Sequence, residues 1–320
     1  MNNFKKIGLS ALAGSLATVS AHAAEFSVSG SASITFDRPA QHLTTGNLYS
    51  MGDSLGFNAS GETDGGLGVA VYYEIDQDDM DDYDMTLSGD WGSLKFNGSG
   101  SSSAFGAVDD VMPNAYEESW DILDTDGTGT TGSPMVIGGG GGANMFIYTS
   151  PSVMGATLTV AYQNGGGAAG ADSYTDYAIA YSPEMVEGLT LGAAVSDNEV
   201  AAGGKNANKT TGYVKYAVGG LTVGYQMSEL DHDTKSSSQE SHGYGITYAV
   251  NDDFSIGYHS HTLEPDSGAS GTSDQESTGI SASYTMGGMT VAGAMNDTDN
   301  MRGTAASDFE AYEFNLSFAF

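Results

Sequence analysis

Alternation between apolar and small polar residues is the feature that most constrains how this chain can fold. The even positions from 26 to 36 are Phe26, Val28, Gly30, Ala32, Ile34 and Phe36, and every odd position between them is serine or threonine. A period of two over a whole segment indicates a β-strand with one apolar face. The pattern recurs and predicts 16 strands, at 26–36, 54–59, 67–76, 83–88, 94–96, 144–150, 158–162, 177–181, 189–195, 214–218, 221–227, 244–250, 254–258, 280–286, 289–295 and 312–320.

The two faces of these predicted strands differ in charge. No position on the apolar faces is charged, whereas the opposite faces carry Glu74, Asp76, Asp84, Lys95, Lys215 and Glu313. A basic residue facing lipid from a barrel strand costs about 2–4 kcal/mol at the bilayer midplane, so the exclusion has a physical cause. The polar face fits a water-filled lumen better than the interior of a soluble sandwich, which packs both layers on apolar residues.

The connections between the predicted strands alternate in length. The short ones are 61–65, 89–92, 151–154, 183–187, 219–220, 251–253 and 287–288, and the long polar ones are 37–52, 77–82, 99–143, 164–173, 197–209, 230–241, 263–275 and 297–308. This layout predicts an all-β fold, a 16-stranded antiparallel transmembrane β-barrel with short periplasmic turns and long extracellular loops. An even strand number places both termini on the periplasmic side.

The connection at 99–143 differs from all the others. It carries seven carboxylates and no lysine or arginine, and shows no helix or strand period. A structureless segment of this length is usually functional or disordered. A domain boundary here is the alternative, but five preceding strands cannot close a barrel and would leave an edge in lipid. We therefore expect one domain over 24–320, with 99–143 folded into the pore as its constriction.

The N-terminus has the features of a secretory signal peptide, which we expect at 1–23. Lys5 and Lys6 precede a short apolar run, and Ala21-His22-Ala23 forms a small-x-small cleavage site. No later stretch reaches the roughly 20 apolar residues of a transmembrane helix, which excludes a helical membrane protein. The chain has no cysteine, so neither disulfides nor thiolate chemistry contribute.

The charge is strongly acidic. Cleavage after Ala23 removes two lysines and leaves 7 basic against 41 acidic side chains, a formal net charge of −34 over 297 residues. Such a field repels nucleic acids and anions and attracts cations. The same acidity could also reflect a saline habitat.

Two motifs carry a resemblance to a known family. The segment Asn144-Met145-Phe146-Ile147-Tyr148-Thr149-Ser150-Pro151 resembles the strand that follows the third loop of general Gram-negative porins, and Ser103-Ala104-Phe105-Gly106 is similar to the start of that loop. Ile147 stands where an inward polar residue is common, and we expect it to pack against the folded-in loop. The terminal Phe320, with aromatic or apolar residues at alternate positions before it, resembles the signature read by the barrel-assembly machinery.

The resemblance implies a homotrimeric diffusion channel in the outer membrane, with a basic cluster on the wall opposite the third loop. This chain departs from the last point, because its candidate wall cations are only Lys95, Lys215 and Arg38. For Lys95 and Lys215 the simpler alternative is local pairing with carboxylates in the lumen. The expected constriction residues are Asp109, Asp110, Glu117, Glu118, Asp121, Asp124 and Asp126.

Metal sites are weaker hypotheses. Asp124-Thr125-Asp126-Gly127 begins like a calcium loop but lacks its later ligands, and Met135 stands where the closing glutamate belongs. A better candidate for a calcium site is the group Asp78, Asp79, Asp81 and Asp82, although simple solvation of these carboxylates is the favoured interpretation. His259 and His261 share one strand face without an identifiable third ligand, so lumen lining is favoured over a metal site.

The sequence therefore predicts a porin for passive diffusion of small hydrophilic solutes, with a preference for cations and no cofactor. A substrate-selective channel is the alternative, although inward aromatics are few (Tyr72 and Tyr213). A barrel enzyme would need a placed Ser-His or Asp-His set, which the sequence does not indicate. A secreted acidic adhesin would need calcium-binding repeats, and none is present.

Overall fold

A computed structural model describes residues 25–39, 48–76, 79–120, 137–138, 142–165, 173–198, 207–233, 238–266 and 273–320. The expected signal peptide at 1–23 lies outside these residues. Among the described residues, no helix has the length and apolar character to cross a membrane.

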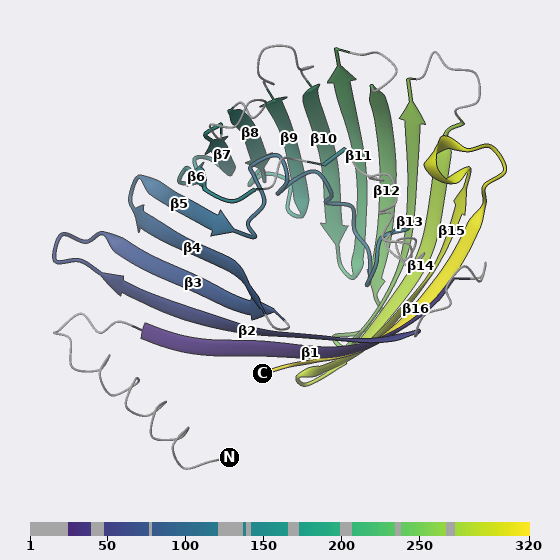
Figure 1. Cartoon of the computed structure of the whole chain (residues 1–320), viewed down its shortest axis with the longest axis horizontal. Helices are drawn as coiled ribbons and strands as arrows, with labels where there is room; N and C mark the ends of the chain where they lie inside the picture. Colours follow the sequence, from purple (N-terminus) through teal and green to yellow (C-terminus); the bar gives the residue numbers. More distant parts are fainter. Residues whose placement is uncertain are drawn as a thin grey trace.

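Sixteen antiparallel strands form one closed barrel in which each strand pairs with the next along the chain and β1 pairs with β16 (Figure 1). The strands are β1 (Glu25–Pro39), β2 (Tyr49–Glu62), β3 (Gly68–Asp76), β4 (Asp79–Gly89), β5 (Gly92–Ser99), β6 (Met145–Thr149), β7 (Ala156–Gln163), β8 (Tyr174–Tyr181), β9 (Leu189–Asn198), β10 (Ala207–Val218), β11 (Leu221–His232), β12 (Gln239–Ala249), β13 (Phe254–Pro265), β14 (Gln275–Met286), β15 (Met289–Asp299) and β16 (Phe309–Ala319). The predicted number and order of strands are confirmed.

The C-terminal residue closes the ring. Gly30 and Phe320 exchange two backbone hydrogen bonds, each 2.9 Å long. The Phe320 ring lies so close to Gly30 that a Cβ there would come within 2.6 Å of it. A glycine on β1 thus makes room for the terminal aromatic side chain.

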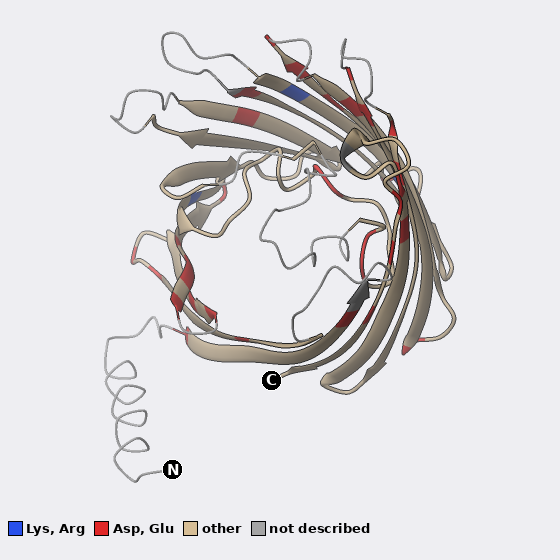
Figure 2. Ribbon diagram, turned by 45° about the vertical axis from the view of Figure 1, so that its right-hand side comes forward, with Lys and Arg blue, Asp and Glu red and all other residues tan. Residues whose placement is uncertain are grey.

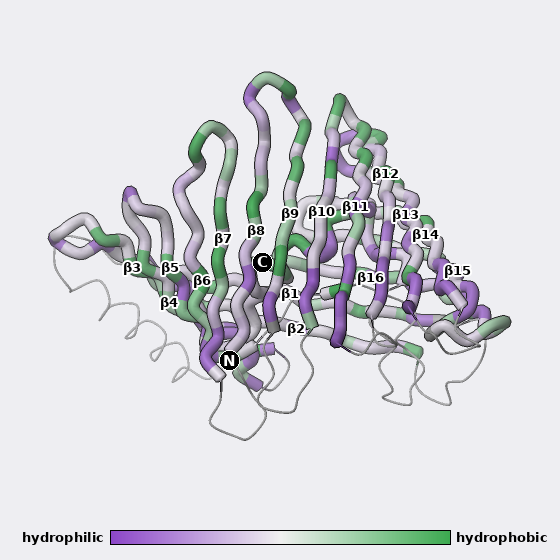
Figure 3. Tube along the Cα trace, turned by 90° about the horizontal axis from the view of Figure 1, so that it is seen from above, coloured by the Kyte–Doolittle hydropathy of each residue, from purple (hydrophilic) through white to green (hydrophobic). Residues whose placement is uncertain are grey.

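The two faces of the barrel wall follow the alternation seen in the sequence. Apolar side chains such as Val28, Ile34, Ile280 and Phe318 point outward and are 48–54% exposed. Figure 3 shows hydrophobic residues toward the short-turn end of the strands and hydrophilic residues toward the long-loop end. An apolar surface of this extent requires a partner, and in a barrel of this type the partner is the membrane hydrocarbon.

All seven short turns are confirmed, but the strands extend further toward the long loops than predicted. For example, β10 begins at Ala207 rather than 214, and β11 continues to His232. In the extensions of β10, β11 and β12 the outward positions are glycine or polar, as at Glu229 and Glu240, so the apolar contrast that marked the strands is lost while the pairing continues.

The prediction of a loop at 77–82 is wrong in its extent. β4 already begins at Asp79, and only residues 77 and 78 lie between β3 and β4. The β3–β4 register shifts between Tyr73 and Ile75, so Asp81 and Asp82 together occupy the space opposite Glu74. A β-bulge of this kind preserves the strand while placing one additional residue in it.

Candidate functional site

The segment after β5 lies inside the barrel. Figure 1 shows it leaving β5 and crossing the inner faces of the strands from β8 toward β13. Residues 100–120 of this segment contact side chains first from β8 and β11, and then from β14, β16, β15 and β13. Residues 100–120 of the third long connection therefore lie inside the barrel, along its inner wall.

The start of the segment is held by a buried carboxylate on β8. Asp176 accepts hydrogen bonds from the backbone amides of Ala104 (3.1 Å) and Phe105 (2.8 Å), and from the Tyr174 hydroxyl (2.8 Å). Asp176, Ala104 and Phe105 are fully buried. Hydrogen bonds to a charged acceptor are among the stronger ones in proteins. Asp176 is therefore the main polar anchor of the segment's first turn.

An apolar cluster surrounds this anchor. Phe105 and Val108 pack in one buried group with Met145 and Ile147 from β6. The expectation that Ile147 packs against the folded-in segment is confirmed. An inward isoleucine is stable here because it faces the segment rather than water.

A single glutamine on β11 holds the middle of the segment. The Gln226 side-chain oxygen accepts a hydrogen bond from the Val111 amide at 3.1 Å. Its side-chain nitrogen donates to the backbone oxygens of Val108 and Asp109, both at 2.8 Å. One buried amide side chain thus satisfies backbone donors and acceptors that would otherwise lie against the wall without partners.

Inward glycines allow the segment to lie flat on the wall. A Cβ at Gly224 would meet Pro113 at 2.6 Å, and at Gly245 it would meet the Pro113 carbonyl oxygen at 2.2 Å. At Gly257 a Cβ would meet the Ala115 nitrogen at 2.8 Å. Strands β11 to β13 each contribute one of these glycines, so together they form a shallow track for residues 113–115.

The end of the described segment is held by histidines and polar side chains of β13 to β16. The Ser119 hydroxyl lies 3.0 Å from His259 Nδ1, and the Trp120 ring meets His259 and His261 edge-on, with centroids 4.8 and 4.6 Å apart. Both histidines are buried. They line the inner face as predicted, and they support Trp120.

Two further contacts fix the residues around the expected constriction. The Tyr116 hydroxyl donates to the Glu313 carboxylate, and burial together with this contact raises the pKa of Tyr116. Asn296 donates to the Glu118 backbone oxygen at 2.7 Å. The backbone at 116–118 is therefore held firmly against β15 and β16.

Four of the seven predicted constriction carboxylates are described, and all four lie on the inner segment. Asp109, Asp110, Glu117 and Glu118 are half-buried. The Glu118 carboxylate accepts a hydrogen bond from Asn114. Asp121, Asp124 and Asp126 lie outside the described residues, as does the weak calcium-loop match that includes them.

The predicted wall cations have different surroundings. Lys95 pairs with Asp84 at 3.2 Å, which is the local pairing that the sequence left open as its alternative. Lys215 lies on the inner face of β10 and is half-buried. The backbone of Arg38 belongs to β1, but its side chain is outside the described part of the structure.

Sequence reasoning missed Lys209, a basic residue on the inner face of β10 that interacts with the segment's anchor. It donates to the Gly138 backbone oxygen and interacts electrostatically with Asp109 and Asp176. It therefore joins the outgoing and returning parts of the third connection. The predicted loop at 197–209 includes Lys209, although the alternation, continued back from Lys215, places Lys209 on the inner face.

The candidate divalent site at the β3–β4 end is not assembled among the described residues. Asp79 and Asp81 are exposed, Asp82 is half-buried, and Asp78 is outside the described residues. No three side chains that ligate metals converge within the described parts of the chain. Figure 2 shows that carboxylates far outnumber basic residues over the barrel as a whole.

Comparison with known proteins shows which family the chain belongs to. A family model described as Gram-negative porin matches residues 8–320. The chain belongs to the Gram-negative porin family. No curated protein sequence matches this porin.

Solved structures share its fold at low identity. An anion-selective porin from Comamonas acidovorans is 14% identical with a TM-score of 0.68, covering 93% of this porin and 100% of that chain. OmpF from Salmonella typhi is 14% identical with a TM-score of 0.66, covering 92% and 97%. The trimer form of OmpT, an outer membrane protein of Vibrio cholerae, is 10% identical with a TM-score of 0.65, covering 93% and 99%. At these identities the likeness shows the fold, and the sign of ion selectivity must be argued from this porin's own residues.

Proposed function

We propose that this porin forms a water-filled, cation-preferring channel for passive diffusion of small hydrophilic solutes across the outer membrane. The observation that supports the proposal is the charge of the inner face. Carboxylates of the segment and of the wall outnumber the inward lysines, and Lys95 and Lys209 each interact with carboxylates. Unbalanced acidic side chains at a narrow place lower the energy of cations and raise that of anions. The protein acts without a reaction or cofactor in this proposal.

Reversal potentials in a potassium chloride gradient across a planar bilayer test the proposal. We expect potassium to be several-fold more permeant than chloride, and the double variant Glu117→Gln/Glu118→Gln to move the ratio toward one. The matched control is Glu229→Gln/Glu240→Gln, which removes two carboxylates that face each other on the outside of β11 and β12. A wild-type ratio at or below one would contradict the cation preference.

The same pair of variants separates selectivity from general acidity. If the carboxylates serve mainly to keep the protein hydrated in a saline habitat, inner and outer substitutions should change permeability equally little. If they select cations, only the inner pair should act, because charges beyond about 8–10 Å are screened at physiological ionic strength.

We also propose that the molecule is a homotrimer in outer-membrane lipid. The trimer form of one similar structure supports this, as do the exposed apolar side chains of β1 and β2, such as Phe26 and Leu55. Mass measurement of the detergent-solubilised protein should give three chains. A monomer that retains full channel activity would contradict the trimer.

Assembly and export complete the proposal. Residues 1–23 act as a cleaved signal peptide, and Phe320 serves as the signal for the barrel-assembly machinery. Deletion of Phe320 should reduce insertion into the outer membrane, because it removes both this signal and the closing contact with Gly30.

We also propose, as a secondary hypothesis, that calcium binds to Asp79, Asp81 and Asp82 together with Asp78. Thermal unfolding that is unaffected by chelation of calcium would remove it.

A further inference from the structure

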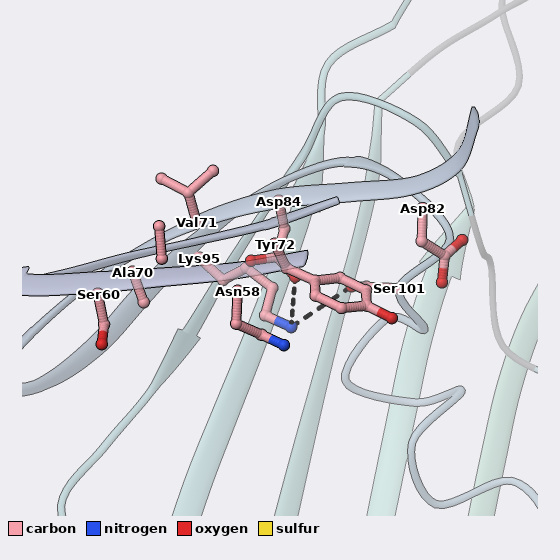
Figure 4. A pocket seen from close by; sticks show the side chains of 10 residues that line it. Asn58, Ser60, Ala70, Val71, Tyr72, Asp82, Asp84, Lys95 and Ser101 are labelled. Atoms are coloured by element: carbon pink, nitrogen blue, oxygen red, sulfur yellow. Dashed lines mark hydrogen bonds and ion pairs between the residues drawn. The ribbon is translucent and has the colours of Figure 1, made fainter. Parts of the chain in front are cut away.

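A cavity of about 460 Å³ lies on the inner wall at β2 to β5, away from the strands on which residues 104–120 pack. Residues of strands β2 to β5, together with Ser101 just after β5, line it (Figure 4). Its lining includes the side chains of Asn58, Ser60, Tyr72, Asp82, Asp84, Lys95 and Ser101. In Figure 4 Tyr72 lies between Lys95 and Asp82, and Val71 points to the opposite face of the sheet.

The cavity has an excess of negative charge that its own lysine does not remove. Lys95 is held by Asp84 at 3.2 Å and by the Ser101 hydroxyl at 3.4 Å. Asp82 interacts electrostatically with Glu74 and Asp84. Two carboxylates, Asp82 and Asp84, therefore line the cavity with one ammonium group, which is paired with Asp84. Asp82 lies on the far side of Tyr72 from Lys95.

The position of Asp82 depends on an unusual backbone. Gly100 has a φ of +86°, and a Cβ there would fall 1.5 Å from the Asp82 carboxylate oxygen. Only glycine tolerates both this conformation and this close approach. Together with the bulge in β4, Gly100 places a carboxylate at the cavity wall where a regular strand and any other residue would not.

The arrangement suits an organic ammonium group better than a metal ion. A divalent cation requires several oxygens within about 2.3–2.6 Å of one point, and no such group occurs among the described residues. A primary ammonium instead donates to acceptors that are spread apart, and it is also attracted by an aromatic face. The cavity offers spread acceptors, the Tyr72 ring and neutral polar side chains at Asn58 and Ser60.

We propose that this cavity is a binding site for small organic cations that carry primary ammonium groups, with the Asp82 carboxylate and the Tyr72 ring as the recognising groups. The inference rests on the proposed cation-preferring channel and names a class of solute for it. Entry of such a solute into the cavity blocks part of the current while it is bound.

The test uses 1,4-diaminobutane as the probe and 1,4-butanediol as its neutral analogue, added to the full channel in a planar bilayer. We expect the diamine to reduce single-channel current in a saturable manner and the diol to have only a small, linear effect. Asp82→Asn should raise the half-blocking concentration about tenfold, the equivalent of about 1.4 kcal/mol. Asp231→Asn, an exposed carboxylate on the outside of β11, is the matched control and should leave the block unchanged.

A second variant acts in the opposite direction. Lys95→Met removes the partner of Asp84 and should lower the half-blocking concentration, so the inference stays testable if Asp82→Asn fails to fold. If the diamine and the diol act alike on a channel that still prefers potassium, the binding site is wrong while the proposed function stands. If the protein conducts no ions or prefers chloride, the proposed function itself is wrong.

Discussion

The inner wall of this porin has two halves that arise from the same alternation but differ in what they face. From β8 to β16 many inward residues contact the folded-in segment, among them glycines such as Gly245 and buried polar groups such as Asp176 and Gln226. From β2 to β5 they include Tyr72, Asp84 and Lys95, which line a cavity that only Ser101 among the described residues of the segment reaches.

The difference shows that the residue type at an inward position depends on what that position contacts, in addition to the strand alternation. Where another part of the chain lies against the wall, each polar group must find a partner and each Cβ must have room. Where water lies against it, charge and hydrogen-bonding groups are free to vary and can serve solutes. The two halves thus divide structural and transport roles, and the variants below test that division.

The largest effect is expected at the buried anchor. Asp176→Ala removes the acceptor of three donors, the amides of Ala104 and Phe105 and the Tyr174 hydroxyl. Leaving buried donors unsatisfied costs about 1–3 kcal/mol each, so we expect the segment to lose about 3–5 kcal/mol of local stability. Hydrogen exchange at Ala104 and Phe105 measures the loss. Asp197→Ala, an exposed position on neighbouring β9, is the control, and equal exchange in both variants would contradict the anchor.

The glycine track should give the next effect. Gly245→Val places a side chain where the Pro113 carbonyl oxygen lies, and overpacking of this kind costs about 1–3 kcal/mol. We expect amide exchange at Val111 and Ala115 to accelerate about 10- to 100-fold. Gly212→Val is the control, because a Cβ there meets only one atom, at 3.9 Å, on the outward side of β10. Unchanged exchange in Gly245→Val would show that the segment does not lie on this track.

A smaller, pH-dependent effect is expected at Tyr116. Because burial and Glu313 raise its pKa, the docked segment retains the Tyr116 proton at a pH where an undocked tyrosine ionises. Docking is therefore fully stable below about pH 10, the ordinary tyrosine value, and weakens as the pH rises above it. Trp120 emission in a Trp91→Phe background should shift to longer wavelength over this range.

Tyr116→Phe separates this effect from general alkaline unfolding. It should abolish the pH dependence above pH 10 at a cost of about 1–2 kcal/mol for the lost hydrogen bond. Tyr148→Phe, at an exposed hydroxyl that donates to the Trp91 backbone, is the control and should retain the wild-type response. A Tyr116→Phe protein that responds like wild type would contradict the assigned role of Tyr116.

The barrel was predictable from sequence because its two faces meet different solvents. Strand number, strand order and the short turns all follow from apolar residues at alternate positions with glycine and proline between them. Strand ends were not predictable, because beyond the apolar band Glu229 or Glu240 on the outside resembles a loop residue. Because apolar and polar positions no longer alternate near the strand ends, the sequence also predicts Lys209 and Asp82 in loops, although both lie on strands.

The candidate site was predictable only in outline. The acidic segment and its inward position follow from its place after the fifth strand and from the resemblance of its flanking motifs to those of the porin third loop. Its partners on the wall could not be inferred, because Asp176, Gln226 and His259 come from strands that are remote in sequence. Which wall residues contact the segment depends on the path of the segment through the barrel, and no local sequence pattern predicts that path.

Disulfide formation in the cysteine-free chain tests the central claim most directly. The Ala115 amide lies 3.1 Å from the Ser281 hydroxyl on β14, on the covered half of the wall. We expect the double variant Ala115→Cys/Ser281→Cys to form an intramolecular disulfide on oxidation. The matching pair Ala115→Cys/Ser60→Cys, with its second cysteine on the open half, should stay reduced. A disulfide to position 60 with none to position 281 would contradict the claim that residues 104–120 lie along β8 to β16 and not against β2.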